Sequence, residues 1–156
     1  MLGVLAALAL IFGYVESLIP TGIPGVKLGL GNLVVLTAMY ALSVRSAMAV
    51  SAVKILLGSL LFGSFAGLLY SLCGGVVSFA VMLLLKKSGK FGLVGVSAAG
   101  GAAHNLAQLA AACAVLGGVK IAVMLPLLLV SGVVTGVLTG AAAVPCTRLA
   151  ERAARR

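Results

Sequence analysis

The chain has 156 residues, of which 63% are apolar and 8% are charged, whereas a soluble domain averages about 45–50% apolar and about 25% charged residues. This composition excludes a soluble globular domain, a disordered chain and a fibrous repeat, and it predicts an integral membrane protein. A helix needs about 20 apolar residues to cross about 30 Å of hydrocarbon. We therefore expect an all-α bundle of six transmembrane helices that forms one membrane domain over residues 1–156.

Six apolar segments are the predicted helices. In chain order they cover approximately residues 1–19, 32–42, 47–62, 65–85, 93–116 and 121–144. The first has no basic start and no small-residue cleavage site, so we expect a retained helix rather than a signal peptide. Two prolines and four glycines between Pro20 and Gly31 predict a loop before the second helix. Because the second helix is short, part of this loop can enter the membrane against protein.

Basic residues are unevenly distributed between the two ends of this predicted bundle. With six helices, one side of the membrane carries both termini and eight basic residues: Arg45, Lys86, Lys87, Lys90, Arg148, Arg152, Arg155 and Arg156. The other side carries Lys27 and Lys120. Cytoplasmic segments are enriched in Lys and Arg, so we expect both termini in the cytoplasm of a bacterial cell and the protein in its cytoplasmic (inner) membrane. The net charge of +9 then reflects topology, and we expect no nucleic-acid partner.

Few residues are available for catalysis or for binding a metal. The chain has two acidic residues, Glu16 and Glu151, and no Asp, so it cannot assemble the carboxylate cluster that Mg²⁺-dependent phosphoryl chemistry uses. It lacks the phosphate-binding pattern G-x-x-x-x-G-K-[ST], and its three cysteines lie far apart without a C-x-x-C pair. We therefore expect a protein that is not an enzyme and that has no metal site and no cofactor.

Small residues recur at helical spacing in several predicted helices. In the last helix, Gly132, Gly136 and Gly140 each follow a hydroxyl residue, which gives a face that lets a neighbouring helix approach closely. We expect these three glycines to pack helices within the bundle. The stretch from Gly67 through Ser71 to Gly75 has the same spacing.

The first helix carries two such pairs, Gly3 with Ala7 and Ala9 with Gly13. A small-residue face either packs inside the bundle or binds another membrane protein. Because a six-helix bundle can leave one helix at its rim, these four residues are the predicted positions for docking a partner.

Polar residues gather at one depth of the predicted bundle. An ionisable group at mid-membrane costs roughly 2.5–3.5 kcal/mol on insertion scales, and such groups usually face the bundle interior. The residues between mid-membrane and the outer surface are Glu16, Asn32, Lys54, Tyr70, His104, Asn105 and Gln108. Most of them also have a structural interpretation. Lys54 can extend to the surface, Tyr70 can be an interfacial aromatic, and Glu16 can accept hydrogen bonds from loop amides. The remaining alternatives are hydrogen bonds between helices, made by His104, Asn105 and Gln108. Their grouping favours a ligand-binding pocket open to the outside, with Lys27 in the loop that caps it.

The segment Glu16-Ser-Leu-Ile-Pro20, followed by Pro24-Gly-Val-Lys-Leu-Gly-Leu-Gly-Asn32, resembles the Gx transporter family. This family is also described as heptaprenyl diphosphate synthase component I, and its members are similar to the substrate-binding S components of energy-coupling factor (ECF) vitamin transporters. The resemblance covers essentially the whole chain.

The resemblance implies a six-helix bundle that holds a small molecule beneath the loop between its first two helices. It also implies that small residues of the first helix dock onto a transmembrane coupling subunit driven by ATPases. The sequence thus predicts the substrate-binding component of an uptake system. Two alternatives remain open: an accessory membrane subunit linked to prenyl diphosphate, quinone or flavin redox metabolism, and a self-sufficient channel or carrier.

Overall fold

The computed structural model describes residues 1–19 and 28–154. Within this part of the chain it contains six α-helices, one short 3-10 helix and no strand. The elements are α1 (Leu2–Ser17), α2 (Leu30–Ala41), α3 (Val44–Phe62), α4 (Phe65–Ser88), α5 (Leu93–Leu116), η1 (Val119–Met124) and α6 (Leu125–Ala154). The predicted all-α fold is confirmed, and the first five helices begin and end close to their predicted positions.

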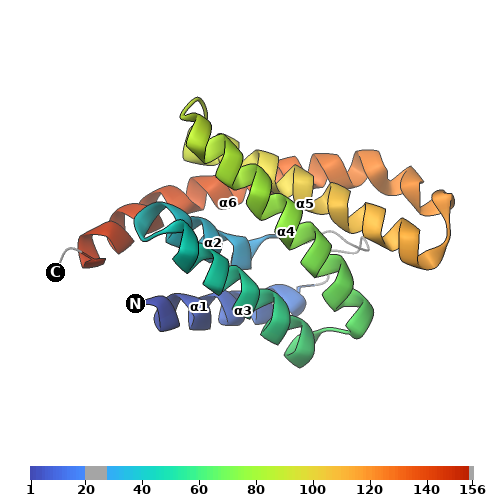
Figure 1. Ribbon diagram of the computed structural model, residues 1–156, viewed down its shortest axis with the longest axis horizontal. Helices are drawn as coiled ribbons and strands as arrows, with labels where there is room; N and C mark the ends of the chain where they lie inside the picture. Colours follow the sequence, from blue (N-terminus) through green and yellow to red (C-terminus); the bar gives the residue numbers. More distant parts are fainter. Residues whose placement is uncertain (20–27, 155–156) are drawn as a thin grey trace.

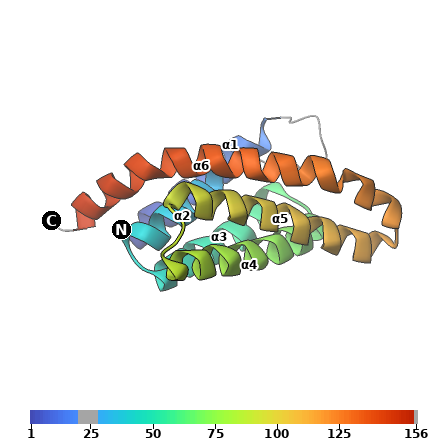
Figure 2. The same ribbon diagram turned by 90° about the horizontal axis from the view of Figure 1, so that it is seen from above.

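The last helix is longer than the sequence predicted. The expected end was near Val144. In the structure α6 continues through Pro145 to Ala154. Proline cannot donate the helical hydrogen bond to the carbonyl four residues earlier, here that of Ala141, and Pro145 and Ala141 are both exposed on the helix surface. Its final turns extend beyond the other helices (Figure 2).

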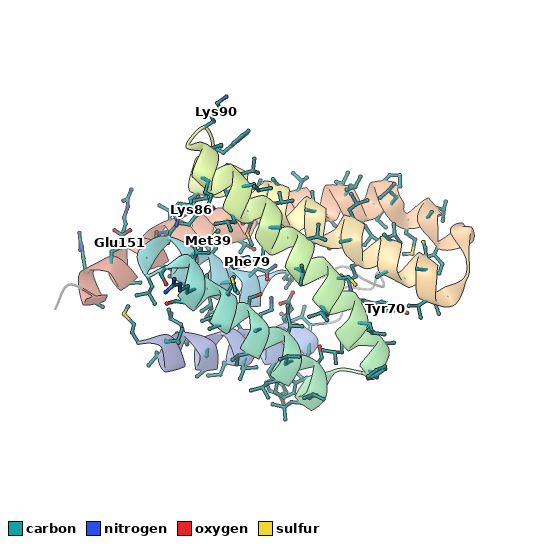
Figure 3. All side chains as sticks on the ribbon, viewed as in Figure 1. Met39, Tyr70, Phe79, Lys86, Lys90 and Glu151 are labelled. Atoms are coloured by element: carbon teal, nitrogen blue, oxygen red, sulfur yellow. The ribbon has the colours of Figure 1, made fainter. Side chains whose placement is uncertain are left out.

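The helices run back and forth along the long axis of the molecule, which places the N-terminus and the last described turn of α6 at the same end (Figures 1 and 2). Lys86 and Lys90 lie towards this end (Figure 3). The Lys86 ammonium donates to the Met39 carbonyl and lies 4.5 Å from the centroid of the Tyr40 ring. The sequence predicts that this basic end of the bundle lies in the cytoplasm, and this orientation stays a prediction.

The core surrounds α2, which contacts α1, α3 and α6. Residues 34–39 of α2 are all buried, as expected for a helix with neighbours on every side. At about 1.5 Å per residue, the 12 residues of α2 are too few to cross the hydrocarbon core alone. The first turn of α2 lies at the wall of an internal cavity, where Gly29 and Asn32 form part of the lining.

Three stretches of the described chain are long and apolar enough to cross a membrane: Val44–Phe62, Phe65–Ser88 and Ile121–Ala153. α5 also has 24 residues, but His104, Asn105 and Gln108 make it less apolar. Large apolar side chains cover the outer surfaces of the helices, with Leu60 72% and Val123 82% exposed, as expected where lipid replaces water. The protein is therefore an all-α membrane bundle, as the sequence predicted.

Candidate functional site: a polar cavity inside the bundle

A cavity of about 300 Å³ lies inside the bundle and receives residues from all six α-helices. This volume is at the lower end of the range found for small-molecule sites, about 300–1,000 Å³. Its polar lining residues are Glu16, Ser17, Asn32, Ser51, Lys54, Ser59, Ser71, Ser78, His104, Asn105 and Thr135. The structure thus brings five of the predicted site residues to one cavity: Glu16, Asn32, Lys54, His104 and Asn105.

Glu16 holds the start of α2 against the end of α1. One carboxylate oxygen, Oε1, accepts a hydrogen bond from the Gly29 backbone N–H at 2.6 Å. Gly29 has a φ of +79°, a left-handed conformation that glycine adopts at no steric cost. On the other side of this turn, the Thr139 hydroxyl of α6 donates to the Leu28 carbonyl at 3.4 Å. The entry into α2 is therefore fixed from both α1 and α6.

Lys54 reaches the same turn from α3. Its ammonium donates to Asn32 Oδ1 at 2.5 Å. Its aliphatic stem lies against Gly31, where an added Cβ would be 2.9 Å from Lys54 Cδ. The lysine is therefore directed into the bundle at the cavity wall, and with Glu16 it places one positive and one negative group beside the first turn of α2.

His104 and Asn105 form the α5 side of the cavity. The imidazole of His104 packs on Gly74 of α4, where an added Cβ would lie 2.9 Å from His104 Cε1. Asn105 is 7% exposed, and its Nδ2 donates to the Leu128 carbonyl at 2.8 Å and to Ser131 Oγ at 3.3 Å. These contacts attach the wall of the cavity to both α4 and α6.

Three of the predicted ligand residues are not part of this lining. Tyr70 is the neighbour of the lining residue Ser71 on α4, and it lies towards the end of the molecule opposite Lys86 (Figure 3). Gln108 lies one turn beyond His104 along α5 and outside the lining set. Tyr70 and Gln108 thus lie outside the described lining, and their assignment to the ligand site stays a prediction. Lys27 lies outside the described residues.

Sequence reasoning did not identify the small and hydroxyl residues of α3 and α4 as site residues. They form one stripe along each helix: Ser51, Gly58 and Ser59 on α3, and Gly67, Ser71, Gly75 and Ser78 on α4. The helical spacing of Gly67, Ser71 and Gly75 was visible in the sequence, but it also fits close helix packing. The aromatic rings of Phe62 and Phe79 complete these two walls.

The predicted packing glycines of α6 face α5. A Cβ added to Gly132 would lie 2.6 Å from the Gly101 carbonyl oxygen, and one added to Gly136 would lie 2.7 Å from Ala98 Cα. At Gly140 the corresponding distance to Val94 Cα is 2.8 Å. Real Cβ atoms essentially never approach so closely, so the two backbones touch along this glycine stripe.

The four predicted docking residues of α1 do not share one face. Gly3 and Ala7 are exposed, but Ala9 is fully buried in the core and Gly13 lines the cavity. The spacing of Ala9 and Gly13 from Gly3 and Ala7 is not a multiple of a helical turn, which places the two pairs on different sides of α1. Ala9 is therefore an interior residue and Gly13 faces the cavity, and a docking role for the four residues stays a prediction.

The chain matches one protein family over most of its length. The family described as heptaprenyl diphosphate synthase component I matches residues 5–145. The chain belongs to this family. The range shared with the heptaprenyl diphosphate synthase component I family contains every residue that lines the described cavity. No curated protein and no solved structure matches the chain.

The described residues of this family member contain no group of three or more His, Cys, Asp or Glu side chains that could hold a metal ion. The polar groups of this lining are hydroxyls, amides, one carboxylate, one ammonium and one imidazole. The arrangement is thus suited to holding a small polar molecule by hydrogen bonds.

Proposed function

We propose that the protein is the membrane-embedded, substrate-binding component of an uptake system of the ECF type, and that it takes a small molecule from outside the cell into its cavity. The observation that supports this proposal is the cavity of about 300 Å³ inside an apolar bundle, with polar groups from α1 to α6 in its wall. Buried polar groups in a membrane interior are costly, and they usually mark a substrate pathway or binding site.

The proposed assembly follows from what the chain lacks. It has no phosphate-binding loop for ATP, so energy for uptake would come from ATPases acting through a transmembrane coupling subunit. Gly3 and Ala7 remain the proposed contact positions on α1, since both are exposed and small residues allow close approach of a second helix. The protein would reside in the bacterial cytoplasmic membrane with both termini inside.

The name of the family favours a second candidate function. A protein of the heptaprenyl diphosphate synthase component I family can serve as an accessory membrane subunit of prenyl diphosphate synthesis, with catalysis in its partner. The chain itself has no Asp and only two Glu residues, so it would not supply the metal-binding carboxylates.

Purification from bacterial membranes in a mild detergent separates the two functions. The uptake proposal predicts a bound small metabolite at about one per chain in native mass spectra, together with a membrane coupling subunit and ATPases in the co-purified fraction. Co-purification of a prenyl diphosphate synthase without a small metabolite would favour the accessory function and contradict the uptake proposal.

The orientation has a separate test in whole cells. Gly118→Cys should react with a membrane-impermeant thiol reagent added outside, whereas Ser88→Cys at the basic end should not. Both substitutions belong in a background without Cys73, Cys113 and Cys146. The reverse labelling pattern would place the termini outside and contradict the proposed direction of uptake.

A further inference from the structure

Asn105 has a fixed orientation at the cavity wall. The Leu128 carbonyl can only accept a hydrogen bond, so the Asn105 atom 2.8 Å away must be the NH₂ nitrogen. The second hydrogen of this nitrogen is directed to Ser131 Oγ at 3.3 Å, while the Ser131 hydroxyl itself donates to the Leu128 carbonyl at 3.0 Å. Both hydrogens of the amide are therefore used on the α6 side.

The other end of the amide, Oδ1, has no hydrogen-bond partner among the described residues. Asn105 is 93% buried, with 7% of its surface exposed, and it lines the cavity. Flipping the amide would place Oδ1 against the Leu128 carbonyl, so this acceptor cannot turn towards α6. Gly132 makes the arrangement possible, because a Cβ there would lie 2.9 Å from Asn105 Nδ2.

A second lining residue has an unused polar group. Ser78 of α4 is 3% exposed, lines the same cavity and has no side-chain hydrogen bond within residues 1–19 and 28–154. A hydroxyl can donate or accept, so Ser78 can satisfy either kind of ligand group. Asn105 Oδ1 can only accept, and it therefore determines what a ligand must offer.

The charges in the described lining limit the net charge of a ligand. The described lining carries one carboxylate, Glu16, and one ammonium, Lys54, beside the imidazole of His104. Each of the first two already has a hydrogen-bond partner on the first turn of α2. A diphosphate would bring two or more negative charges into a site of low dielectric beside Glu16, where the described lining holds no matching set of cations.

From these observations, and resting on the proposed ligand-binding function, we infer that the cavity binds a small polar molecule without net charge that donates an N–H or O–H to Asn105 Oδ1. Neutral hydroxylated or amide-bearing metabolites and zwitterions belong to this class, and diphosphates do not. Asn105 thereby selects for a hydrogen-bond donor on the ligand.

The first test is a thermal-shift panel on the purified full-length protein in detergent. The probes are nucleosides and amino acids as neutral or zwitterionic donors, and inorganic pyrophosphate and isopentenyl diphosphate as anions. Compounds that raise the melting temperature should come from the first group. Stabilisation by the diphosphates alone would overturn this inference and leave a small-molecule site intact. If neither group binds, the ligand-binding function itself fails, and this inference with it.

The second test removes the donor from the best probe by methylation. Leaving Asn105 Oδ1 unpaired should weaken binding by roughly 5- to 150-fold, and in Asn105→Ala the parent and methylated probes should bind alike. Ser131→Ala is the matched control, because it removes a contact of Asn105 on the α6 side and keeps the hydrogen bond from Asn105 to the Leu128 carbonyl. The affinity of this variant for the parent probe should stay near that of the unmodified protein. Should Asn105→Ala fail to fold, the comparison of the two probes on the unmodified protein still decides. Equal affinity of the unmodified protein for the parent and the methylated probe would overturn the inference.

Discussion

The α5–α6 interface and the cavity wall at Gly58 of α3 use glycine in opposite ways. Between α5 and α6, Gly132 and Gly136 bring two backbones into contact, so that no side chain fits between them. On α3, Gly58 has no atom within 4 Å of the position that a Cβ would occupy, and it lines the cavity. The same residue type therefore closes one region of the bundle and leaves space in the other. The two glycine positions differ in the residues that lie opposite them, and a sequence pattern does not show which residues those are.

The largest loss of stability should follow from a large side chain at the α5–α6 contact. In Gly136→Leu the new side chain would meet the Ala98 and Ser97 backbones, each 2.7 Å from the Cβ position. Overpacking typically costs about 1–3 kcal/mol, and rigid backbone neighbours place this variant at or above the upper value. Its melting temperature in detergent should fall well below that of Gly3→Leu, whose Cβ position has no atom within 4 Å. Equal melting temperatures would show that the glycine stripe does not support the bundle.

A leucine in the open region should remove ligand binding without unfolding the protein. Gly58→Leu directs its side chain into the cavity, so we expect ligand affinity to fall by more than about tenfold, or about 1.4 kcal/mol, with an unchanged melting temperature. Binding by isothermal titration, beside the thermal scan, measures both quantities. If Gly58→Leu binds normally, the ligand lies elsewhere.

A smaller loss is expected when one polar group of the wall is removed. Asn32→Ala takes away the oxygen that accepts from the Lys54 ammonium and should weaken ligand binding by roughly 5- to 150-fold, the effect of about 1–3 kcal/mol. Thr37→Ala is the matched control on α2, because Thr37 is buried and donates to the Leu33 carbonyl outside the cavity. Similar affinities for the two variants would contradict the assignment of Asn32 to the ligand site.

The smallest effect belongs to Gln108. Its Oε1 is buried without a hydrogen-bond partner in the described part of the chain, and the residue does not line the cavity. Replacing an unsatisfied polar group by an apolar one of similar shape is nearly neutral or stabilising. Gln108→Leu should therefore retain ligand affinity and keep or raise the melting temperature. A loss of affinity comparable with that of Asn32→Ala would show that Gln108 belongs to the ligand site.

These contrasts show what could be predicted from the sequence. Apolar runs of sufficient length, separated by glycine, proline and basic stretches, were enough to predict six helices, because the membrane imposes both length and composition on them. The predicted end of α6 near Val144 was wrong, because the helix continues through the exposed Pro145 and the basic tail to Ala154.

Only part of the site could be predicted, because only some of its residues are unusual in a membrane helix. Ionisable and amide residues are rare in membrane helices, so Glu16, Lys54 and His104 were recognised from their presence alone. Tyr70 differs from its neighbour Ser71 only in its angle around α4, which a single sequence does not fix for a helix apolar on all sides. The serines of the wall were missed because small residues at helical spacing fit a packed interface and a cavity equally well.

The central claim is that the open region between the helices is the ligand site, and native mass spectrometry of protein released from gentle detergent tests it most directly. The unmodified protein and Gly3→Leu should each retain a small molecule at about one per chain. Gly58→Leu, equally folded, should appear as the bare chain. Retention of the same molecule by Gly58→Leu at the same occupancy would contradict the account.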